Sequence, residues 1–357
     1  MSTRATTQSS QNTFGRLFSH ALVQEVLGLV IMLVLIILVM NQASDVFLSA
    51  RNFNNLLLAS STIGIIAVFS TMLMIGGGLD LSVASTAALS GVLIGVFQES
   101  WGLGNAVAVA LATGALIGLI NGILVTYVGI NALITTLGML SIARGMAFVL
   151  ADGLTIPVFD LAGTQPQAYT LFAQLSEAKV NLLIAQDVPL PVVVMITLFV
   201  IGFFVLRFTT YGRAMYAIGG NREASRLAGL SVKRYRMIAF TLSGLSAAVA
   251  GVFLTSRLYA ADPKAAPNVE LTVITAVVLG GTSLAGGRGS LVGTFLGVLI
   301  LSTLLNGMNL QSISTDYQNV AQGTVLLLAV FIDQVRLGNV RLGTDRIRKW
   351  LLSRADE

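Results

Sequence analysis

The chain has 357 residues, of which 55% are hydrophobic and 10% are charged, and it contains no cysteine. A soluble domain carries about 25% charged residues, so this composition excludes a water-exposed surface over most of the chain. The absence of cysteine excludes disulfides and cysteine-based metal or nucleophile sites. We interpret the formal charge of +5 as Lys and Arg that orient a membrane protein, rather than as a nucleic-acid-binding surface.

Apolar runs recur along the chain at lengths that suit membrane-spanning helices. The first run follows a polar segment, 1–21, which we interpret as an uncleaved cytoplasmic N-terminal tail. The expected fold is an all-α polytopic membrane domain over residues 22–333. Its ten spans are predicted at about 22–40, 56–75, 82–98, 105–128, 131–150, 192–207, 236–258, 272–285, 291–309 and 317–333.

The basic residues predict which side of the membrane each connection occupies. With the N-terminus in the cytoplasm, 16 of the 21 Lys and Arg residues fall in cytoplasmic segments, which are 1–21, 76–81, 129–130, 207–236, 286–290 and 334–357. Such an excess is typical of cytoplasmic loops. All six prolines fall in 151–191 or 259–271, which this topology places outside. We therefore expect cytoplasmic N- and C-termini, a basic cytoplasmic loop at 207–236 and an ordered external loop at 151–191 with a short helix near 168–178.

The C-terminal segment 334–357 alternates basic and apolar residues. This pattern favours an amphipathic helix lying on membrane lipid at the cytoplasmic surface. A solvated basic tail is the alternative.

Motifs for catalysis and nucleotide binding are absent from the sequence. It contains no H-E-x-x-H or G-x-S-x-G motif, and the glycine runs at 76–78 and 280–281 lack the Lys-Ser/Thr of a P-loop. We therefore expect no catalytic residue, no metal site and no cofactor in this chain. If ATP drives its activity, another subunit must bind the nucleotide.

Two charged residues interrupt the apolar runs. Asp80 lies in IGGGLDLSVAS, where we expect either a tight cytoplasmic turn or a helix broken within the membrane. We favour Asp80 as the cap of the next helix over direct contact with a solute. Arg144 lies about thirteen residues into its span. It is either a path or packing residue with a carboxylate or carbonyl partner, or a side chain that reaches the outer interface.

Polar and glycine patterns hint at an internal duplication. A second glycine-rich break follows at 278–293, and Asn121-Gly122 has a counterpart in Asn306-Gly307. Duplicated halves are common in transporters. Asn121, Asn131 and Asn306 either line a path for a polar solute or form hydrogen bonds between helices, which is the interpretation we favour for each residue alone.

The basic loop contains the signals of a short helix. Asn221 suits an N-cap, Glu223 places negative charge in the first turn and Gly229 suits the C-terminal cap. The two turns between these signals have too small an apolar face to be stable alone. We expect this helix to dock on a partner surface, with a position on lipid headgroups as the alternative.

Four stretches carry a resemblance to a known family over most of residues 50–335. They are GGGLDLSVAS, ALITTLGMLSIARGMA, YAIGGNREASRLAGLSVKRYRMIAFTLSGLSAAVAGV and ELTVITAVVLGGTSLAGGRGSLVGT. In this order they resemble ribose-type permease subunits of bacterial ABC importers. The family commonly has an acid where this chain has Thr272, although Glu270 remains, and it often has Pro or Gln where this chain has Asn131.

The resemblance implies partners as well as a fold. These are a second permease copy or paralogue, cytoplasmic ABC ATPase subunits that hold ATP and Mg, and a periplasmic sugar-binding protein, all assembled at the bacterial inner membrane. It makes 207–236 the coupling loop. Within this loop the coupling helix, which docks on the ATPase, has as its expected coupling residues Asn221, Arg222, Glu223, Ala224, Arg226, Leu227 and Gly229.

The function expected is the translocation path for a ribose-like monosaccharide, opened alternately to each side. A permease for nucleosides or another small polar solute is the alternative, followed by an ion-coupled secondary transporter. The candidate residues for the path or its packing are Asp80, Asn121, Asn131, Arg144, Glu270 and Asn306.

Overall fold

The structure, a computed structural model, describes residues 20–159, 165–182 and 185–336. Helices account for most of these residues, and eight helices are long and apolar enough to cross a membrane. They are α1 (His20–Ala43), α2 (Ala50–Ile75), α3 (Val83–Trp101), α4 (Leu103–Ile123) continued by the π-helical turn η2 (Leu124–Val128), α5 (Ala132–Leu150), α7 (Leu190–Phe208), α10 (Val232–Leu258) and α12 (Leu291–Leu310).

The two other expected spans correspond to helices of a different kind. Helix α11 (Val269–Leu279) has 11 residues, which at 1.5 Å per residue cover about half of a 30 Å core. It ends before residue 285 because Gly280 and Gly281 terminate it. Helix α13 (Thr315–Arg336) has 22 residues but is less apolar than the eight.

Helix α2 begins earlier than the hydrophobic pattern predicted. Ser49 is its N-cap, and the Ser49 hydroxyl accepts the backbone N–H of Asn52 at 3.3 Å. The polar residues before 56, which we expected in a connector, therefore form the first turns of the helix. The N-cap at Ser49, and not the start of the apolar run, therefore sets the beginning of α2.

The two proline-containing connections meet each other at the end of the molecule that holds α6 (Pro166–Glu177). Strand β1 (Ile156–Pro157) pairs antiparallel with β4 (Ala260–Ala261), and β2 (Lys179–Leu182) pairs with β3 (Ala185–Pro189). The short helix expected near 168–178 is present as α6. The pairing of β1 with β4 agrees with the prediction that both connections lie on one side of the membrane.

Helix α10 lies among α2, α3 and α4 and packs against all three. Glycines allow this close approach. A Cβ atom at Gly118 would overlap the backbone of Phe240, and one at Gly244 would overlap the backbone of Gly114.

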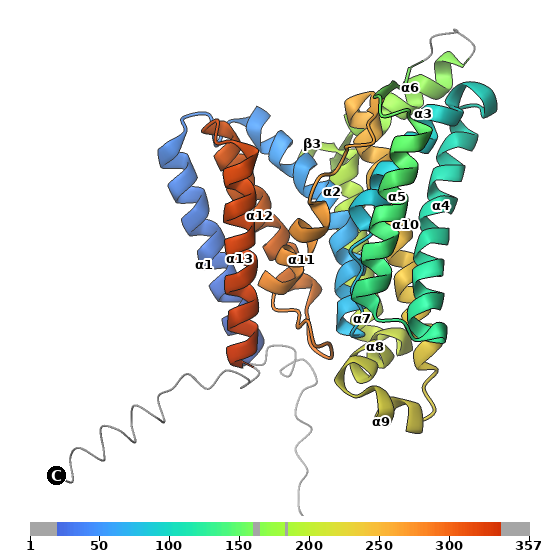
Figure 1. Cartoon of the computed structure of the whole chain (residues 1–357). Coiled ribbons are helices and arrows are strands. Elements are labelled where there is room, and N and C mark those ends of the chain that lie inside the picture. Colours follow the sequence, from blue (N-terminus) through green and yellow to red (C-terminus); the bar gives the residue numbers. More distant parts are fainter. Residues whose placement is uncertain (1–19, 160–164, 183–184, 337–357) are drawn as a thin grey trace, which may run out of the picture.

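The opposite end of the molecule is formed by α8 (Thr210–Gly220) and α9 (Arg222–Leu227), which lie below the long helices in Figure 1. The first described helix begins, and α13 ends, toward this same end (Figure 1). The ends of the described chain are therefore on the side of α9 and away from α6.

Candidate functional site

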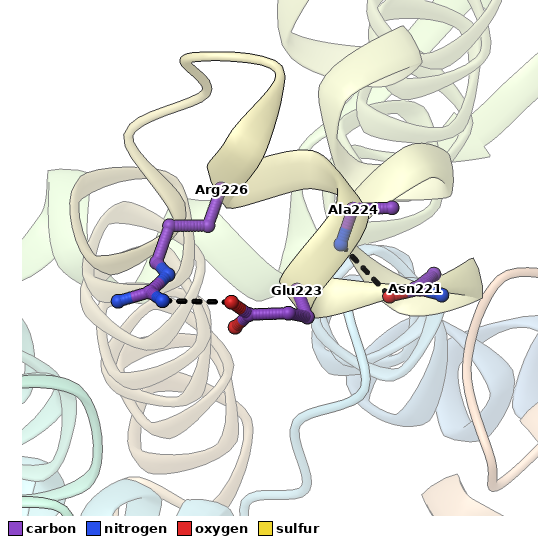
Figure 2. Close-up of polar contacts among 4 residues, drawn as sticks. All are labelled: Asn221, Glu223, Ala224 and Arg226. Carbon is purple, nitrogen blue, oxygen red and sulfur yellow. Dashed lines mark hydrogen bonds and ion pairs between the residues drawn. The ribbon is translucent and has the colours of Figure 1, made fainter.

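Helix α9 has the caps that the sequence predicted at both of its ends. The Asn221 side-chain oxygen accepts the N–H of Ala224 at 2.9 Å (Figure 2). After the last turn, Gly229 takes a positive φ of 83° and its N–H donates to the Arg226 carbonyl at 3.0 Å. The next N–H, from Leu230, donates to the Ser225 carbonyl, which completes a Schellman motif. These local bonds hold a helix of six residues in place.

The outer face of α9 is open to solvent. Glu223 and Arg226 form an ion pair at 2.7 Å (Figure 2), with side chains 64% and 72% exposed. Leu227 is 78% exposed, although it is an apolar residue in the middle of a basic loop. An exposed ion pair of this kind contributes only about 0.2–1 kcal/mol to stability. The outer face therefore has features of a docking surface more than of a stabilising one.

Arg222 differs from its neighbours on α9 because its guanidinium contacts the membrane domain. Its Nη2 atom donates to the carbonyl oxygen of Gly77 at 2.6 Å. Arg236, on α10, donates to the same oxygen at 3.3 Å. The first residue of α9 is thus bonded directly to the glycine break that follows α2.

The two glycine breaks have the same backbone geometry. After α2, the N–H groups of Gly77 and Gly78 donate to Met74 and Leu73, each at 2.9 Å. After α11, Gly281 and Thr282 donate to Val278 and Val277 at 2.9 and 3.2 Å. Gly77 and Gly281 both have positive φ, so each break is a Schellman motif. This repetition agrees with the internal duplication that the sequence suggested.

The breaks also touch each other and the end of α8. The N–H of Gly287 donates to the Ile75 carbonyl at 2.8 Å. A Cβ atom at Gly219 would overlap the backbone of both Ile75 and Gly287. We call this meeting point the glycine junction, which comprises residues 76–78, 219–220 and 286–287. It includes the last two residues of α8, and only Asn221 separates it from α9 along the chain.

Asp80 lies directly after the junction and is buried. Its Oδ1 atom accepts the N–H and the hydroxyl of Ser82 at 3.0 and 2.6 Å, and its Oδ2 atom accepts the hydroxyl of Ser243 at 2.9 Å. The Asn121 side chain donates to the Ser82 hydroxyl at 3.0 Å. Ser82 occupies the N-cap position of α3 without a side-chain cap bond. The carboxylate thus holds Ser82 just before the first turn of α3 and connects it to α10 through Ser243, while Ser82 in turn is bonded to Asn121 on α4.

The other asparagine candidates have different surroundings. Asn306, on α12, exchanges two hydrogen bonds with Asn52 on α2, at 2.9 and 3.0 Å. This amide pair fits the interpretation of Asn306 as a link between helices. Asn131 is exposed and caps α5, where its side chain accepts the N–H of Leu133 at 2.8 Å. It also lines a groove beside the junction, which is described below.

Arg144 and Glu270 come together toward the end opposite α9. Arg144 is half-buried and donates to the carbonyls of Pro263 and Ala265 at 2.7 and 2.9 Å. Arg144 and Glu270 both line a pocket of about 290 Å³, together with Lys264. Thr272 is buried and donates to the Asn268 carbonyl at 3.1 Å. Arg144 therefore has the carbonyl partners that we considered, and it shares this pocket with Glu270, another candidate path residue.

Sequence reasoning missed several residues of this site. Arg236 was counted among the charges that set orientation, but it is buried and bonded to Gly77. Ser243 and Asn52 are partners of predicted residues that lie far away in the sequence. Within the described ranges, no group of three His, Cys, Asp or Glu side chains is arranged to hold a metal ion.

Comparison with known proteins places this chain among transport proteins. Residues 52–330 match the family model "Branched-chain amino acid transport system / permease component". The chain belongs to this permease family. The permease is 38% identical over 322 residues to the ribose import permease protein RbsC of Escherichia coli (strain K12), covering 89% of this chain and 96% of that protein. No solved structure matches it.

Two further relatives are similar over most of their length. The RbsC protein of Bacillus subtilis (strain 168) is 39% identical over 310 residues, with 86% of this chain and 91% of that protein covered. The L-arabinose ABC transporter permease protein AraH of Azospirillum brasilense is 37% identical over 315 residues, with 87% of each chain covered. The resemblance to ribose-type permeases drawn from the four sequence stretches is confirmed.

Proposed function

We propose that this chain is the permease subunit of an ATP-driven importer and forms the membrane path for a monosaccharide. The observation that carries the proposal is the similarity, over nearly the whole chain, to permeases whose names specify ribose and L-arabinose import. Pentose chemistry is the common feature of these names. The structure adds a short exposed helix that is bonded to the membrane domain at the position where the family resemblance implies a coupling helix.

We place the permease in the bacterial inner membrane with ten crossings and both termini in the cytoplasm. Eight helices have the length and composition of spans, and the described chain begins and ends on the side of α9. Helices α11 and α13 supply the two remaining crossings in this proposal, α11 together with the segment that leads to the junction. The tails 1–21 and 334–357, including the expected amphipathic helix, lie almost wholly outside the described residues.

In the proposed mechanism, α9 receives the movement of the ATPase and passes it to the glycine junction. The outer face of α9 offers Glu223, Arg226 and Leu227 to the ATPase. Arg222 transmits the displacement because its guanidinium holds the Gly77 carbonyl at 2.6 Å. Gly77 precedes Asp80, which bonds to Ser82 at the start of α3 and to Ser243 on α10, and Ser82 is bonded to Asn121 on α4. A shift of α9 would therefore reposition several helices together. ATP and Mg belong to the ATPase, and the permease catalyses no bond chemistry.

The remaining partners are a second permease copy or paralogue and a periplasmic sugar-binding protein. The binding protein would meet the end that holds α6, and it would make most of the choice between sugars. A permease for nucleosides or another small polar solute remains the alternative. An ion-coupled transporter is disfavoured because its coupling needs available carboxylates within the membrane, whereas Asp80 is held by three donors.

Reconstitution tests this function directly. The permease, its ATPase and its binding protein are incorporated into liposomes, and uptake of radiolabelled ribose, arabinose, a nucleoside and a branched-chain amino acid is measured. We expect uptake of a monosaccharide that requires ATP and the binding protein. Uptake of the nucleoside alone would favour the alternative. Uptake driven by an ion gradient without the ATPase would contradict the proposal.

A further inference from the structure

Beside the glycine junction lies a groove of about 590 Å³ whose charged side chains are all cationic. It is formed by the break after α2, the turn between η2 and α5, and the side chains of Arg222 and Arg236. No carboxylate lines it within the described part of the chain. Two guanidinium groups thus face one cavity without an acidic counterpart.

Arg236 is the unusual member of this pair. It is only 6% exposed, and arginine is almost never so buried unless it is paired with an acid. One of its nitrogens donates to the Gly77 carbonyl at 3.3 Å, and its buried Nε atom has no hydrogen-bond partner among the described residues. A buried guanidinium charge without a carboxylate beside it is costly unless an anion balances it. This residue therefore points to a missing anion.

The beginning of α5 adds to the attraction for an anion. Asn131, Ala132 and Leu133 line the same groove and form the N-terminus of a 19-residue helix. The positive end of the helix dipole is therefore directed to the region of the two arginines. Apolar side chains line the remainder, namely Met74, Leu79, Val125, Ile130, Leu133 and Leu284.

We propose that this groove is a binding site for a phosphate group, with Arg222 and Arg236 as its ligating residues. Two planar guanidinium groups can donate several charge-assisted hydrogen bonds to the anionic oxygens of one phosphate group, which a phosphate monoester and a phosphodiester both provide. The apolar lining fits a phosphate carried on a larger molecule. Either a phospholipid headgroup or a soluble phosphate monoester provides this chemistry, and both are available at the α9 side of the permease. The site shares Arg222 with the proposed coupling path, but it does not depend on which solute the permease transports.

The first experimental arm tests a soluble phosphate. The full-length permease is placed in nanodiscs of neutral phosphatidylcholine and titrated with glycerol 3-phosphate by calorimetry. We expect one saturable site in the wild type and an affinity at least about ten-fold lower in Arg236→Gln, because a charge-assisted pair is lost. Arg234→Gln is the matched control, since Arg234 is an exposed arginine of the same helix that does not line the groove.

The second arm tests a lipid phosphate. Phosphatidylglycerol is titrated into the same nanodiscs, and lipids retained by the permease are counted by native mass spectrometry. We expect one retained anionic lipid in the wild type and in Arg234→Gln, and its loss in Arg236→Gln. Binding in only one arm identifies the source of the phosphate. Binding in both supports the shared headgroup chemistry.

Two further variants keep the test decisive. If Arg236→Gln does not fold, Arg222→Gln replaces it, because Arg222 is exposed and its loss leaves no buried vacancy. Arg236→Lys keeps the charge but loses the planar fork, and we expect an intermediate affinity. The proposal is overturned if neither arm shows saturable binding, or if Arg234→Gln weakens binding as much as Arg236→Gln and Arg222→Gln do.

Discussion

The two faces of α9 differ in what they hold. On the outer face, Glu223 and Arg226 form an exposed ion pair and Leu227 is exposed. On the inner face, Arg222 is bonded to a carbonyl that lies 145 residues away in the sequence. The outer face can be changed at little cost to the fold, whereas the inner face joins a backbone junction in which Gly219 has no space for a Cβ atom. A part that transmits movement needs both properties, namely a replaceable contact surface and a rigid attachment.

The largest effect is expected where the rigid attachment has no space. Gly219→Ala would place a Cβ atom against backbone atoms of Ile75 and Gly287, which cannot move aside as the end of a flexible side chain could. We expect a destabilisation of about 1–3 kcal/mol or more and loss of sugar uptake. Gly220→Ala is the control, because a Cβ atom there meets nothing within 4 Å. The stability of each variant is measured by thermal unfolding in detergent, and its sugar uptake is measured in proteoliposomes. If the two variants behave alike, the claim that Gly219 is closely packed in the glycine junction is contradicted.

The next effect separates transmission from folding. Arg222→Gln removes the cationic donor to Gly77 while the caps of α9 remain. We expect uptake to fall about ten-fold, within the 5–150-fold range of typical coupling energies, while ATP hydrolysis by the assembled importer continues. Arg234→Gln should transport normally. If uptake and hydrolysis fall in parallel in Arg222→Gln, this arginine supports docking and not transmission.

Asp80 offers a comparison within the network that follows the junction. Asp80→Ala would leave three donors without their acceptor, and we expect a loss of about 1.5–3 kcal/mol in unfolding free energy. Asp80→Asn keeps the shape and one acceptor oxygen, so its loss should be smaller. Thermal unfolding measures both variants. If Asp80→Ala unfolds like the wild type but does not transport, then the carboxylate acts on the solute, which is the alternative that the sequence left open.

The smallest effect on the fold is expected on the outer face. Exchanging the two charges with Glu223→Arg and Arg226→Glu keeps an exposed ion pair, so stability should change by less than about 1 kcal/mol. Its charge pattern toward the ATPase is reversed, so sugar-stimulated ATP hydrolysis and sugar uptake should both fall. Normal stimulation of hydrolysis in this doubly substituted permease would count against docking through α9.

The sequence predicted those features of the structure that depend on residues close together in the chain, such as helix caps and glycine breaks. The ends of α9 were placed correctly because an N-cap asparagine and a positive-φ glycine act within four residues. The repeated breaks were recognisable because glycines ended both helices. Hydrophobicity alone misjudged the start of α2 and the length of α11, where caps and glycines set the boundaries.

What the sequence could not predict depends on distant contacts. The bond from Arg222 to Gly77, the amide pair of Asn52 with Asn306 and the meeting of Gly219 with Gly287 join segments that are far apart in the chain. Nothing in the sequence near Arg236 distinguishes it from the other arginines that set orientation. Only the packing of α10 shows that it is buried.

The most direct test of the account uses the absence of cysteine from this chain. Leu227→Cys introduces one thiol at an exposed apolar position of α9, and its labelling by a water-soluble maleimide is compared in the isolated permease and in the assembled importer. We predict fast labelling in the isolated permease and strong protection, with cross-linking to the ATPase, in the assembled importer. Equally fast labelling in both, with no cross-link, would contradict the claim that α9 docks on the ATPase.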